Sequence, residues 1–371
     1  VDGMSDIFNV NPGEVELGHI PFGHMVFGRM IMHFALSNSM EYALTLKAFP
    51  RDFYNEMVRT GAHGVVGGPI HWTSLIEHDG DKFVPNKKIK PGSLKNLRFA
   101  TSGGEALLPS TYDAINEALD YAGSTAKVGD GLGATETWSA IMANNGINNL
   151  DMTLGNALKS LDVKLIDPDT NKEVENGKPG ILYVSGPSTM LGYHNNEAEN
   201  NKVISYDENG KKWINLGDYV AKLENGEYKY VGRQKRNFVA GVDNVYPEEI
   251  ENLVTSLPEV EGIVVTPIAH ELTQNIPRYH IALTSDDIDI KQFEDKLFEL
   301  IRTKLSESCL PGYTNINGEI KIYPRFIDYS LEPIVRMDNS KVNIGHYKKI
   351  DEEDIKNGKL KIDNNIKILK K

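Results

Sequence analysis

The chain has 371 residues, a length that corresponds to two or three domains. Its 40 Lys and Arg against 52 Asp and Glu leave a formal charge of −12 at pH 7, which disfavours nucleic acid as a partner because phosphates would be repelled. Hydrophobic residues make up 40% of the chain, enough for a packed core, and the single cysteine, Cys309, excludes a disulfide framework and multi-cysteine metal sites.

The apolar runs and the start of the chain bear on its location. No apolar run approaches the roughly 20 residues that a membrane span needs, and Val1-Asp2-Gly3 does not open a signal-peptide pattern. We therefore expect a soluble, cytoplasmic protein without a membrane span. Because the sequence does not open with Met, we also expect that it begins partway through a longer protein.

The first part of the chain, to about residue 150, alternates short apolar runs with helical patterns. Apolar runs occur at Tyr42–Leu46, Val65–Val66 and Leu97–Phe99. Helical patterns occur at Pro50–Thr60 and Tyr112–Tyr121. Such alternation predicts a largely parallel α/β sheet.

Between Leu161 and Val231 the pattern changes to short strands separated by turn signals such as Asn176-Gly177 and Asn209-Gly210. This predicts antiparallel structure, a small barrel or a sandwich, and we place a β-barrel subdomain at about 160–231. The strands are expected at Val163–Ile166, Ile181–Val184, Lys212–Ile214, Tyr219–Ala221 and Tyr228–Val231.

From Glu248 the pattern is mixed again. Strands are predicted at Ile263–Val265 and His280–Leu283, and apolar residues from Ile290 to Leu305 fall at helical spacing. The best boundary lies at Val231-Gly232-Arg233. The expected fold is therefore mixed α/β, with a large domain over residues 1–231 and a small α+β domain over residues 233–371.

A glycine-rich segment, Asp130-Gly131-Leu132-Gly133-Ala134-Thr135-Glu136, ends the α/β region. Its glycines let the backbone approach a ligand closely, and a hydroxyl followed by a carboxylate suits a phosphate oxygen and its Mg²⁺. Taken alone, the segment is more typical of a glycine turn that opens a helix with Thr as the cap.

Other motifs accompany this segment in order along the chain. They are Gly103-Gly104-Glu105, Gly180–Gly186 followed by Gly192-Tyr193, Asn215–Asp218, Gly232–Lys235 and Gly241–Glu251. Together they resemble the adenylate-forming superfamily, which comprises acyl- and aryl-CoA synthetases, peptide-synthetase adenylation domains and luciferases. The resemblance runs from His19 to about Lys341.

The resemblance implies a nucleotide site. Thr135 would contact the phosphate, and Glu136 would help to hold Mg²⁺. Asp218 would accept hydrogen bonds from both ribose hydroxyls, and Arg233 would add a hydrogen-bond donor there. By itself, Asp218 is more typical of a hairpin turn. The nucleotide- and cofactor-binding residues are expected to be Gly103, Gly104, Glu105, Asp130, Gly131, Leu132, Gly133, Thr135, Asp218, Arg233 and Gly241.

Three residues are expected to be catalytic: Thr135, His24 and Lys341. His24 resembles the histidine that lies between the acyl pocket and the nucleotide, although a histidine in an apolar stretch is by default a core residue. Lys341 resembles the catalytic lysine, whose charge on a flexible stem would offset negative charge in the transition state. Without the resemblance, an isolated lysine is more typical of the surface. The match to the family's Gly-Lys-(Val/Ile)-Asp loop is also imperfect, because Ser340 replaces its Gly and Asn343 its Asp.

The resemblance also implies a movement between two reaction steps. Lys235 occupies the hinge position, and rotation there would withdraw Lys341 and bring Gly241 to the thiol channel, where a small residue lets pantetheine pass. Otherwise Lys235 is a surface residue and Gly241 a turn glycine. Leu132 stands where the family usually has an aromatic residue against adenine, and Val239 where many members have Lys.

The implied activity is that of an acyl-CoA synthetase, which uses Mg²⁺ and ATP to adenylate a carboxylic acid, fatty or aryl, and then forms a thioester with CoA. One alternative is adenylation with an acyl- or peptidyl-carrier protein as the thiol; another is a nucleotide-binding remnant without catalysis. The family's phosphate loop, which ends in Pro-Lys-Gly, does not occur between Val1 and Lys371. We therefore expect it upstream, and we expect this chain alone to be inactive.

Overall fold

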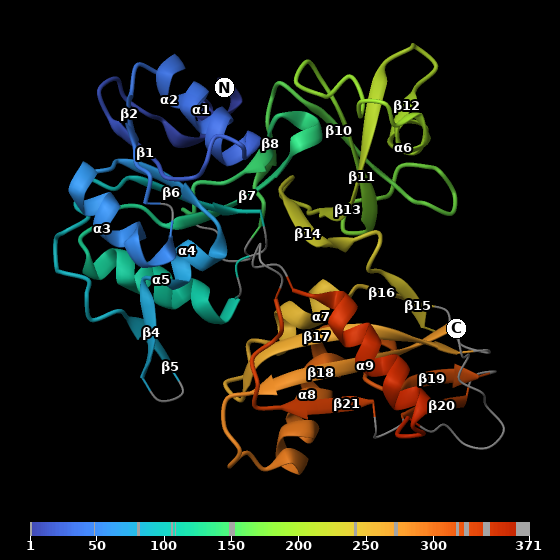
Figure 1. Cartoon of the computed structure of the whole chain (residues 1–371). Helices are drawn as coiled ribbons and strands as arrows, with labels where there is room; N and C mark the ends of the chain where they lie inside the picture. The colour runs from blue at the N-terminus through green and yellow to red at the C-terminus, as the bar shows by residue number, and fades with distance from the viewer. Residues whose placement is uncertain are drawn as a thin grey trace. The chain divides into compact units, whose positions relative to one another are not determined.

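The computed structural model describes residues 2–47, 49–79, 82–104, 107, 109–147, 153–240, 243–270, 274–316, 319–322, 326–336 and 342–360. It divides into two compact units, a large unit of Val1–Val231 and a small unit of Gly232–Lys371 (Figure 1). Each unit has its own core and is described by itself. No helix among these residues is both long enough and apolar enough to span a bilayer.

The large unit is built on a seven-stranded sheet in the order β2-β1-β3-β6-β7-β8-β9. The first five strands in this order pair in parallel and the last two antiparallel, which confirms the predicted α/β character. The strands are β1 (Val15–Gly18), β2 (Glu41–Leu44), β3 (Gly64–Gly67), β6 (Phe99–Gly103), β7 (Val128–Ala134), β8 (Ser139–Ala143) and β9 (Asn156–Ala157). A separate hairpin joins β4 (Ile76–Asp79) to β5 (Lys82–Pro85).

Helices cover both faces of this sheet (Figure 1). On one face Phe53, Trp72 and Ile115 pack on inward residues of the strands such as Val65. On the other face Phe8 and neighbouring apolar residues form a second core. The helices are α1 (Asp2–Phe8), a π-helical turn η1 (Met25–Met30), α2 (Ile31–Ser37), α3 (Pro50–Thr60), α4 (Pro69–Thr73) and α5 (Pro109–Tyr121). Parallel strands buried on both faces in this way leave their carboxyl ends as the open edge for a ligand.

The rest of the large unit is a five-stranded antiparallel sheet, as the turn signals predict. The pairing among the described residues does not include the closure that a barrel needs, so the barrel subdomain stays a prediction. The elements are β10 (Asp162–Ile166), β11 (Pro179–Ser185), α6 (Glu197–Val203), β12 (Ile204–Tyr206), β13 (Lys212–Lys222) and β14 (Tyr228–Arg233).

One strand of this sheet differs from the sequence prediction. The two strands expected at Lys212–Ile214 and Tyr219–Ala221 are a single strand, β13, which bends at Gly217, where φ is +69°. A residue with a side chain would be strained in this left-handed conformation. The glycine therefore lets the strand bend without ending.

In the described residues of the small unit, helices pack on a five-stranded sheet in the order β16-β15-β18-β17, with β21 beside β18 (Figure 1). Phe293, Leu297 and Ile301 form the buried stripe of α8, which confirms the helical spacing in the sequence. The elements are β15 (Phe238–Ala240), β16 (Asp243–Val245), α7 (Pro247–Val254), β17 (Val260–His270), β18 (Gln274–Leu283), α8 (Ile290–Lys304), the 3₁₀ turn η3 (Glu307–Cys309), β19 (Tyr313–Ile316), β20 (Glu319–Ile322), β21 (Ile327–Ser330) and α9 (Ile344–Lys356). A 3₁₀ turn of the large unit, η2 (Thr135–Thr137), follows β7.

A buried cluster of charges fastens α9 to β18. Arg278 of β18 donates to Asp351 of α9 at 2.9 Å and also to Asp354, and its side chain is only 3% exposed. His280 contacts the same Asp351 at 2.9 Å. Burial lowers the pKa of His280, but hydrogen bonds to Asp328 and Asp351 outweigh it and the pKa is raised. The cluster is buried and paired, so removing one partner would leave a charge in the core.

Candidate functional site

The glycine-rich segment lies at the open edge of the parallel sheet. Gly131 and Gly133 belong to β7, and the turn η2 begins at Thr135 with Ala134 as its N-cap. The interpretation of this segment as a glycine turn capped by Thr is therefore wrong. Thr135 is exposed, so its hydroxyl is open to a ligand at the strand end.

Gly103 and Gly104 lie next to this strand end. Gly103 is the last residue of β6 and pairs in register with Gly131 of β7. Gly104 follows with φ of +84°, a left-handed conformation that favours glycine. A Cβ on Gly131 would lie 3.3 Å from the carbonyl oxygen of Met142, so this strand end tolerates little bulk. Glu105 lies outside the described residues.

Glu136 is held by a segment that comes from the antiparallel sheet. The hydroxyl of Tyr193 donates to a carboxylate oxygen of Glu136 at 2.7 Å, and the N–H of Met190 donates to its carbonyl oxygen at 2.7 Å. Burial, followed by the bond to this carboxylate, raises the pKa of Tyr193 to about 12, so the phenol keeps its proton. The Gly192-Tyr193 motif therefore positions Glu136, a role that could not be assigned from the sequence because the two residues are 57 positions apart.

Asp130 faces the other side of the sheet. It is 8% exposed, and burial raises the pKa of its carboxyl to about 8. Its register partner on β6 is Ser102, which places both on the face covered by α5, where burial and, to a smaller extent, Asp130 raise the pKa of Tyr112. Leu132, two residues on, packs against the core of the antiparallel sheet and not against α5. Asp130 thus lies beside the strand-end glycines, with its side chain on the opposite face from Gly131.

Asp218 follows the bend at Gly217 on β13. It is 2% exposed, so the interpretation as a hairpin-turn residue is wrong. The N–H of Gly217 donates to the side chain of Asn215 at 2.8 Å, and this side chain in turn donates to the hydroxyl of Tyr183 at 3.2 Å. The Asn215–Asp218 motif is thus a supported bend within a strand.

His24 is exposed, in a turn immediately before η1, and the expectation of a core histidine does not hold. Its N–H donates to the carbonyl oxygen of Pro21 at 2.9 Å, and its own carbonyl accepts from Gly28 at 2.9 Å. A Cβ on Gly28 would lie 2.4 Å from that Pro21 oxygen. Short π-helical segments of this kind are frequent at functional sites, and this one presents His24 to solvent.

Two other histidines, which the sequence analysis did not single out, are buried at the same edge of the sheet. His19 directly follows β1 and His71 lies in α4, after β3, with ring centroids 4.8 Å apart. Burial and then the charge of His71 lower the pKa of His19 to about 3. His19 is therefore neutral at physiological pH and adds no charge to this edge.

The remaining predicted residues belong to the small unit. Arg233, the last residue of β14, and Lys235, in the turn before β15, are both exposed, and Val239 lies within β15. The carbonyl oxygen of Arg233 accepts from the N–H of Arg236 at 2.9 Å, which closes the turn. Gly241 and Lys341 lie outside the described residues.

An apolar pocket lies against the strand-end glycines in the large unit. The pocket is narrow: its cavity volume is about 20 Å³, and about 320 Å³ of space lies in and around it when the part open to solvent is counted. Its lining is almost wholly apolar and joins α1, η1 and α2 to the four strands β3, β6, β7 and β8. The lining residues are Met4, Phe8, Met30, Ile31, Val66, Thr101, Ser102, Gly131, Leu132, Gly133, Ala140 and Ala143.

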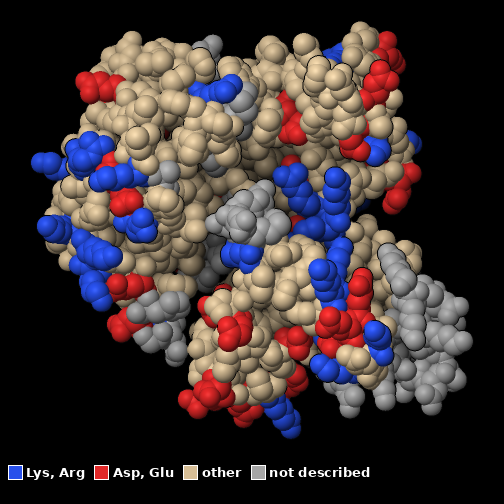
Figure 2. Space-filling model, in the orientation of Figure 1, with Lys and Arg blue, Asp and Glu red and all other residues tan. Residues whose placement is uncertain are grey.

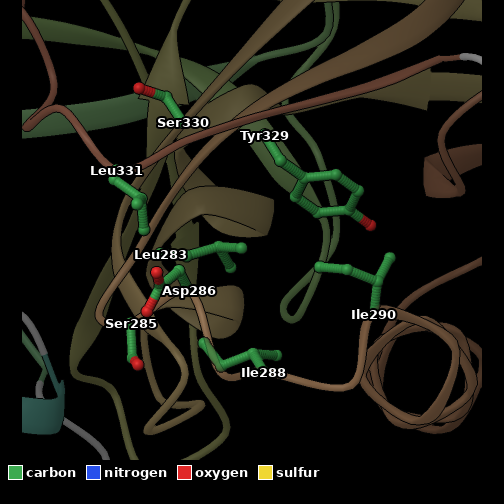
Figure 3. Close-up of a pocket in the computed structure, with 8 residues that line it drawn as sticks. All are labelled: Leu283, Ser285, Asp286, Ile288, Ile290, Tyr329, Ser330 and Leu331. Atoms are coloured by element: carbon green, nitrogen blue, oxygen red, sulfur yellow. The ribbon is translucent and has the colours of Figure 1, made fainter.

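The small unit has a hollow of its own, between the ends of β18 and β21 and the start of α8 (Figure 3). The side chains of Leu283, Ile288, Ile290 and Tyr329 face this space, and the phenol of Tyr329 donates to Glu294 at 2.9 Å. None of the residues predicted from the sequence lines it.

The charged surface is mixed. On the face of the large unit turned to the viewer in Figure 2, Lys and Arg are interspersed with Asp and Glu among broad uncharged areas. Together with the net charge of −12, this mixed face of the large unit does not favour a polyanion as a partner, because a polyanion needs a continuous basic surface.

Among curated proteins, 4-coumarate–CoA ligase 1 of Arabidopsis thaliana is 26% identical over 212 residues, which are 55% of this chain and 36% of that protein. A long-chain-fatty-acid–CoA ligase of Escherichia coli O6:H1 is 34% identical over 184 residues, which are 49% of this chain and 31% of that protein. The chain thus spans about a third of the length of these relatives.

Solved structures share the fold. ATP-bound MatB from Rhodopseudomonas palustris matches with a TM-score of 0.72 at 20% identity, over 94% of this chain and 62% of that one. The amide bond synthetase McbA from Marinactinospora thermotolerans matches with a TM-score of 0.73 at 19% identity, over 94% of this chain and 64% of that one.

A family model decides the relationship. The model described as AMP-binding enzyme matches residues 1–194, which include both strand-end glycine motifs, the Thr135-Glu136 pair and the Tyr193 that holds Glu136. More than half of the sequence is covered, and the chain therefore belongs to the AMP-binding enzyme family.

Proposed function

We propose that the protein is an acid–thiol ligase that couples a carboxylic acid to coenzyme A through an acyl adenylate. The observation that carries the proposal is the end of β7, where the exposed Thr135 and the anchored Glu136 adjoin the glycines of two parallel strands and an apolar pocket. In the first step the acid's carboxylate attacks the α-phosphate of ATP and releases pyrophosphate. In the second step the thiol attacks the acyl carbon and releases AMP.

The donor set at Glu136 fits magnesium. Mg²⁺ prefers oxygen ligands and is commonly bound by one or two carboxylates together with substrate phosphates. No group of three or more His, Cys, Asp and Glu suited to a metal occurs within the described parts of the chain, so Glu136 would share the ion with the nucleotide. The bound ion would neutralise charge on the phosphates, and Tyr193 would keep the carboxylate in place.

The nucleotide's other contacts follow from the same arrangement. Thr135 would donate its hydroxyl to the α-phosphate, and Gly103 and Gly104 would admit the adenine ring close to the backbone. Asp218, a buried carboxylate, would accept hydrogen bonds from the ribose diol, with Arg233 as an added donor. The apolar pocket beside Gly131 would take the tail of the acid.

The catalytic group on the small unit would be Lys341. Its ammonium would offset negative charge as the carboxylate and the α-phosphate react. His24, exposed before η1, would contact the acid's carboxylate side. Rotation at Lys235 would then replace Lys341 by the strand around Gly241 for thiol transfer.

The acceptor defines a second candidate. A structural neighbour is an amide bond synthetase and a curated relative is a nonribosomal peptide synthetase, pngA of Aspergillus terreus. Both names favour adenylation followed by transfer to an acceptor other than CoA. Offering CoA, a phosphopantetheinylated carrier protein and a small amine to the same pre-formed adenylate would identify the acceptor by the product that forms.

The test of the mechanism separates the two half-reactions in the protein expressed from its complete coding sequence. Lys341→Ala is expected to slow adenylate formation by about 100-fold or more, and to leave thioester formation from supplied acyl adenylate near the wild-type rate. Gly241→Leu is expected to do the reverse. Equal losses in both half-reactions for each variant would refute the proposed rotation, and no loss in either would remove both residues from the mechanism.

A further inference from the structure

One row of the parallel sheet carries polar groups in an apolar core. Tyr42 of β2, Glu16 of β1, Gly64 of β3 and Phe99 of β6 are register neighbours, so they share one face of the sheet. That face is the one packed by α1 and α2, and Tyr42 and Phe99 belong to its core. A carboxyl and a phenol therefore lie side by side among Phe and Met side chains.

Two glycines make room for these groups. A Cβ on Gly64 would lie 2.2 Å from a carboxyl oxygen of Glu16 and 1.7 Å from the ring of Phe99. A Cβ on Gly18 would lie 2.2 Å from the Tyr42 ring and 2.5 Å from its hydroxyl. Glu16 thus lies over β3 and Tyr42 over the end of β1, in space that any other residue at these two positions would fill.

The polar atoms are enclosed. Glu16 is 1% exposed, and both its carboxyl oxygens and the Tyr42 hydroxyl are buried without a hydrogen-bond partner among the residues that the structure describes. Burial raises the pKa of Glu16 to about 8, so the carboxyl is mostly protonated at neutral pH. Burial and then Glu16 raise the pKa of Tyr42 to about 12. Both groups are thus neutral, and each offers a donor and an acceptor.

This polar pair adjoins the apolar pocket. Val66 and Thr101, which line the pocket, lie two residues beyond Gly64 and Phe99 on the same strands and on the same face, about 7 Å along the sheet. The ring of Phe8 lines the pocket and contacts Phe99, with centroids 5.8 Å apart. Gly18 lies two residues beyond Glu16 on β1, as Val66 lies two residues beyond Gly64 on β3. Because the Tyr42 ring leans over Gly18, its hydroxyl points along the sheet from Glu16 towards Val66 and the pocket.

We propose that Glu16 and Tyr42 are specificity-determining residues at the far end of the acid pocket, and that the acid carries a hydroxyl group at the end of its tail. The inference rests on the proposed function, since it takes this pocket as the acid's site. A hydroxyl both donates and accepts one hydrogen bond, and so matches a neutral carboxyl and a phenol together. An unsubstituted tail would be buried against the Glu16 carboxyl and the Tyr42 hydroxyl and would offer neither of them a hydrogen bond.

The experiment measures equilibrium binding of two acids by calorimetry: a medium-chain fatty acid with a terminal hydroxyl, and the unsubstituted acid of the same length. Wild-type protein is expected to bind the hydroxy acid about 10-fold more tightly, the worth of one or two buried hydrogen bonds. Tyr42→Phe is expected to remove most of this preference, and Glu16→Leu all of it. Glu16→Gln keeps the size and the neutral hydrogen-bonding ability, and is expected to retain the preference.

Tyr54→Phe is the matched control. It also deletes one phenol hydroxyl in the large unit, but on α3, where the hydroxyl is hydrogen-bonded to Ser93 at 2.9 Å, and it is expected to leave the preference unchanged. Equal affinity of wild-type protein for the two acids, or a preference that survives both Tyr42→Phe and Glu16→Leu, would refute the inference and leave the acid pocket in place. If neither acid bound, the assignment of the pocket would fail and the inference with it.

Discussion

Replacing Glu16 by Gln should stabilise the large unit by an amount that grows with pH. Burial raises the pKa of Glu16 from 4.5 to about 8, so the folded protein holds a proton that the unfolded chain releases. Folding stability then falls as pH rises from about the unfolded pKa to the folded one, by about 1.4 kcal/mol per pH unit. At pH 7 the cost is about 3 kcal/mol, and Gln, which has no proton to lose, avoids it.

The assay is urea unfolding of wild type and Glu16→Gln at several pH values between about 5 and 8. The difference in the free energy of unfolding should be small near pH 5 and should increase steadily towards pH 8. Asp130→Asn should show the same trend, because burial raises that carboxyl's pKa to about 8 as well. Glu56, whose hydrogen bond to Arg59 lowers its pKa to about 2, gives the control: Glu56→Gln should not gain stability with pH. A difference for Glu16→Gln that stays constant across this range would refute the reasoning.

Two further predictions concern binding and the core. Asp218→Ala in the complete protein should weaken ATP binding by roughly 1.5–3 kcal/mol for each charged hydrogen bond lost. The Michaelis constant for the acid should change little. An unchanged Michaelis constant for ATP would remove Asp218 from the site. Arg278→Met should destabilise the small unit by about 3–5 kcal/mol in denaturant unfolding, because it removes the buried guanidinium that pairs with both Asp351 and Asp354. A loss below about 1 kcal/mol would mean that water reaches these carboxylates.

The local patterns of the sequence predicted the regular elements well. Helix α3 spans Pro50–Thr60, the range that its charges and apolar spacing indicated, and α8 begins at Ile290 as its stripe required. The alternation of runs and helices was enough to predict parallel strands, because such strands need a crossover between them. These features depend on residues a few positions apart, which a sequence displays directly.

The arrangement of the site was harder to predict because its contacts join distant residues. Tyr193 holds Glu136 across 57 positions, and Glu16 meets Tyr42 only because β1 and β2 are neighbours in one register. Taken alone, the segment around Gly131 is more typical of a turn, although Gly131 lies in strand β7. A glycine indicates that space is needed, but it does not show whether a neighbouring strand or a bend in the chain requires that space. Taken by itself, Asp218 is similarly more typical of a hairpin turn, because one strand that bends resembles two strands and a hairpin in sequence.

The charged cluster between α9 and β18 has a mechanical consequence for catalysis. Residue 341 precedes the first residue of α9 by three positions, so its backbone can stray from that helix end by at most roughly 11 Å. The helix itself is clamped to the sheet through Arg278. If the small unit rotates as proposed, a lysine tethered so closely to this helix would move with the unit. Its position would then depend mainly on the orientation of the small unit and little on the conformation of the loop.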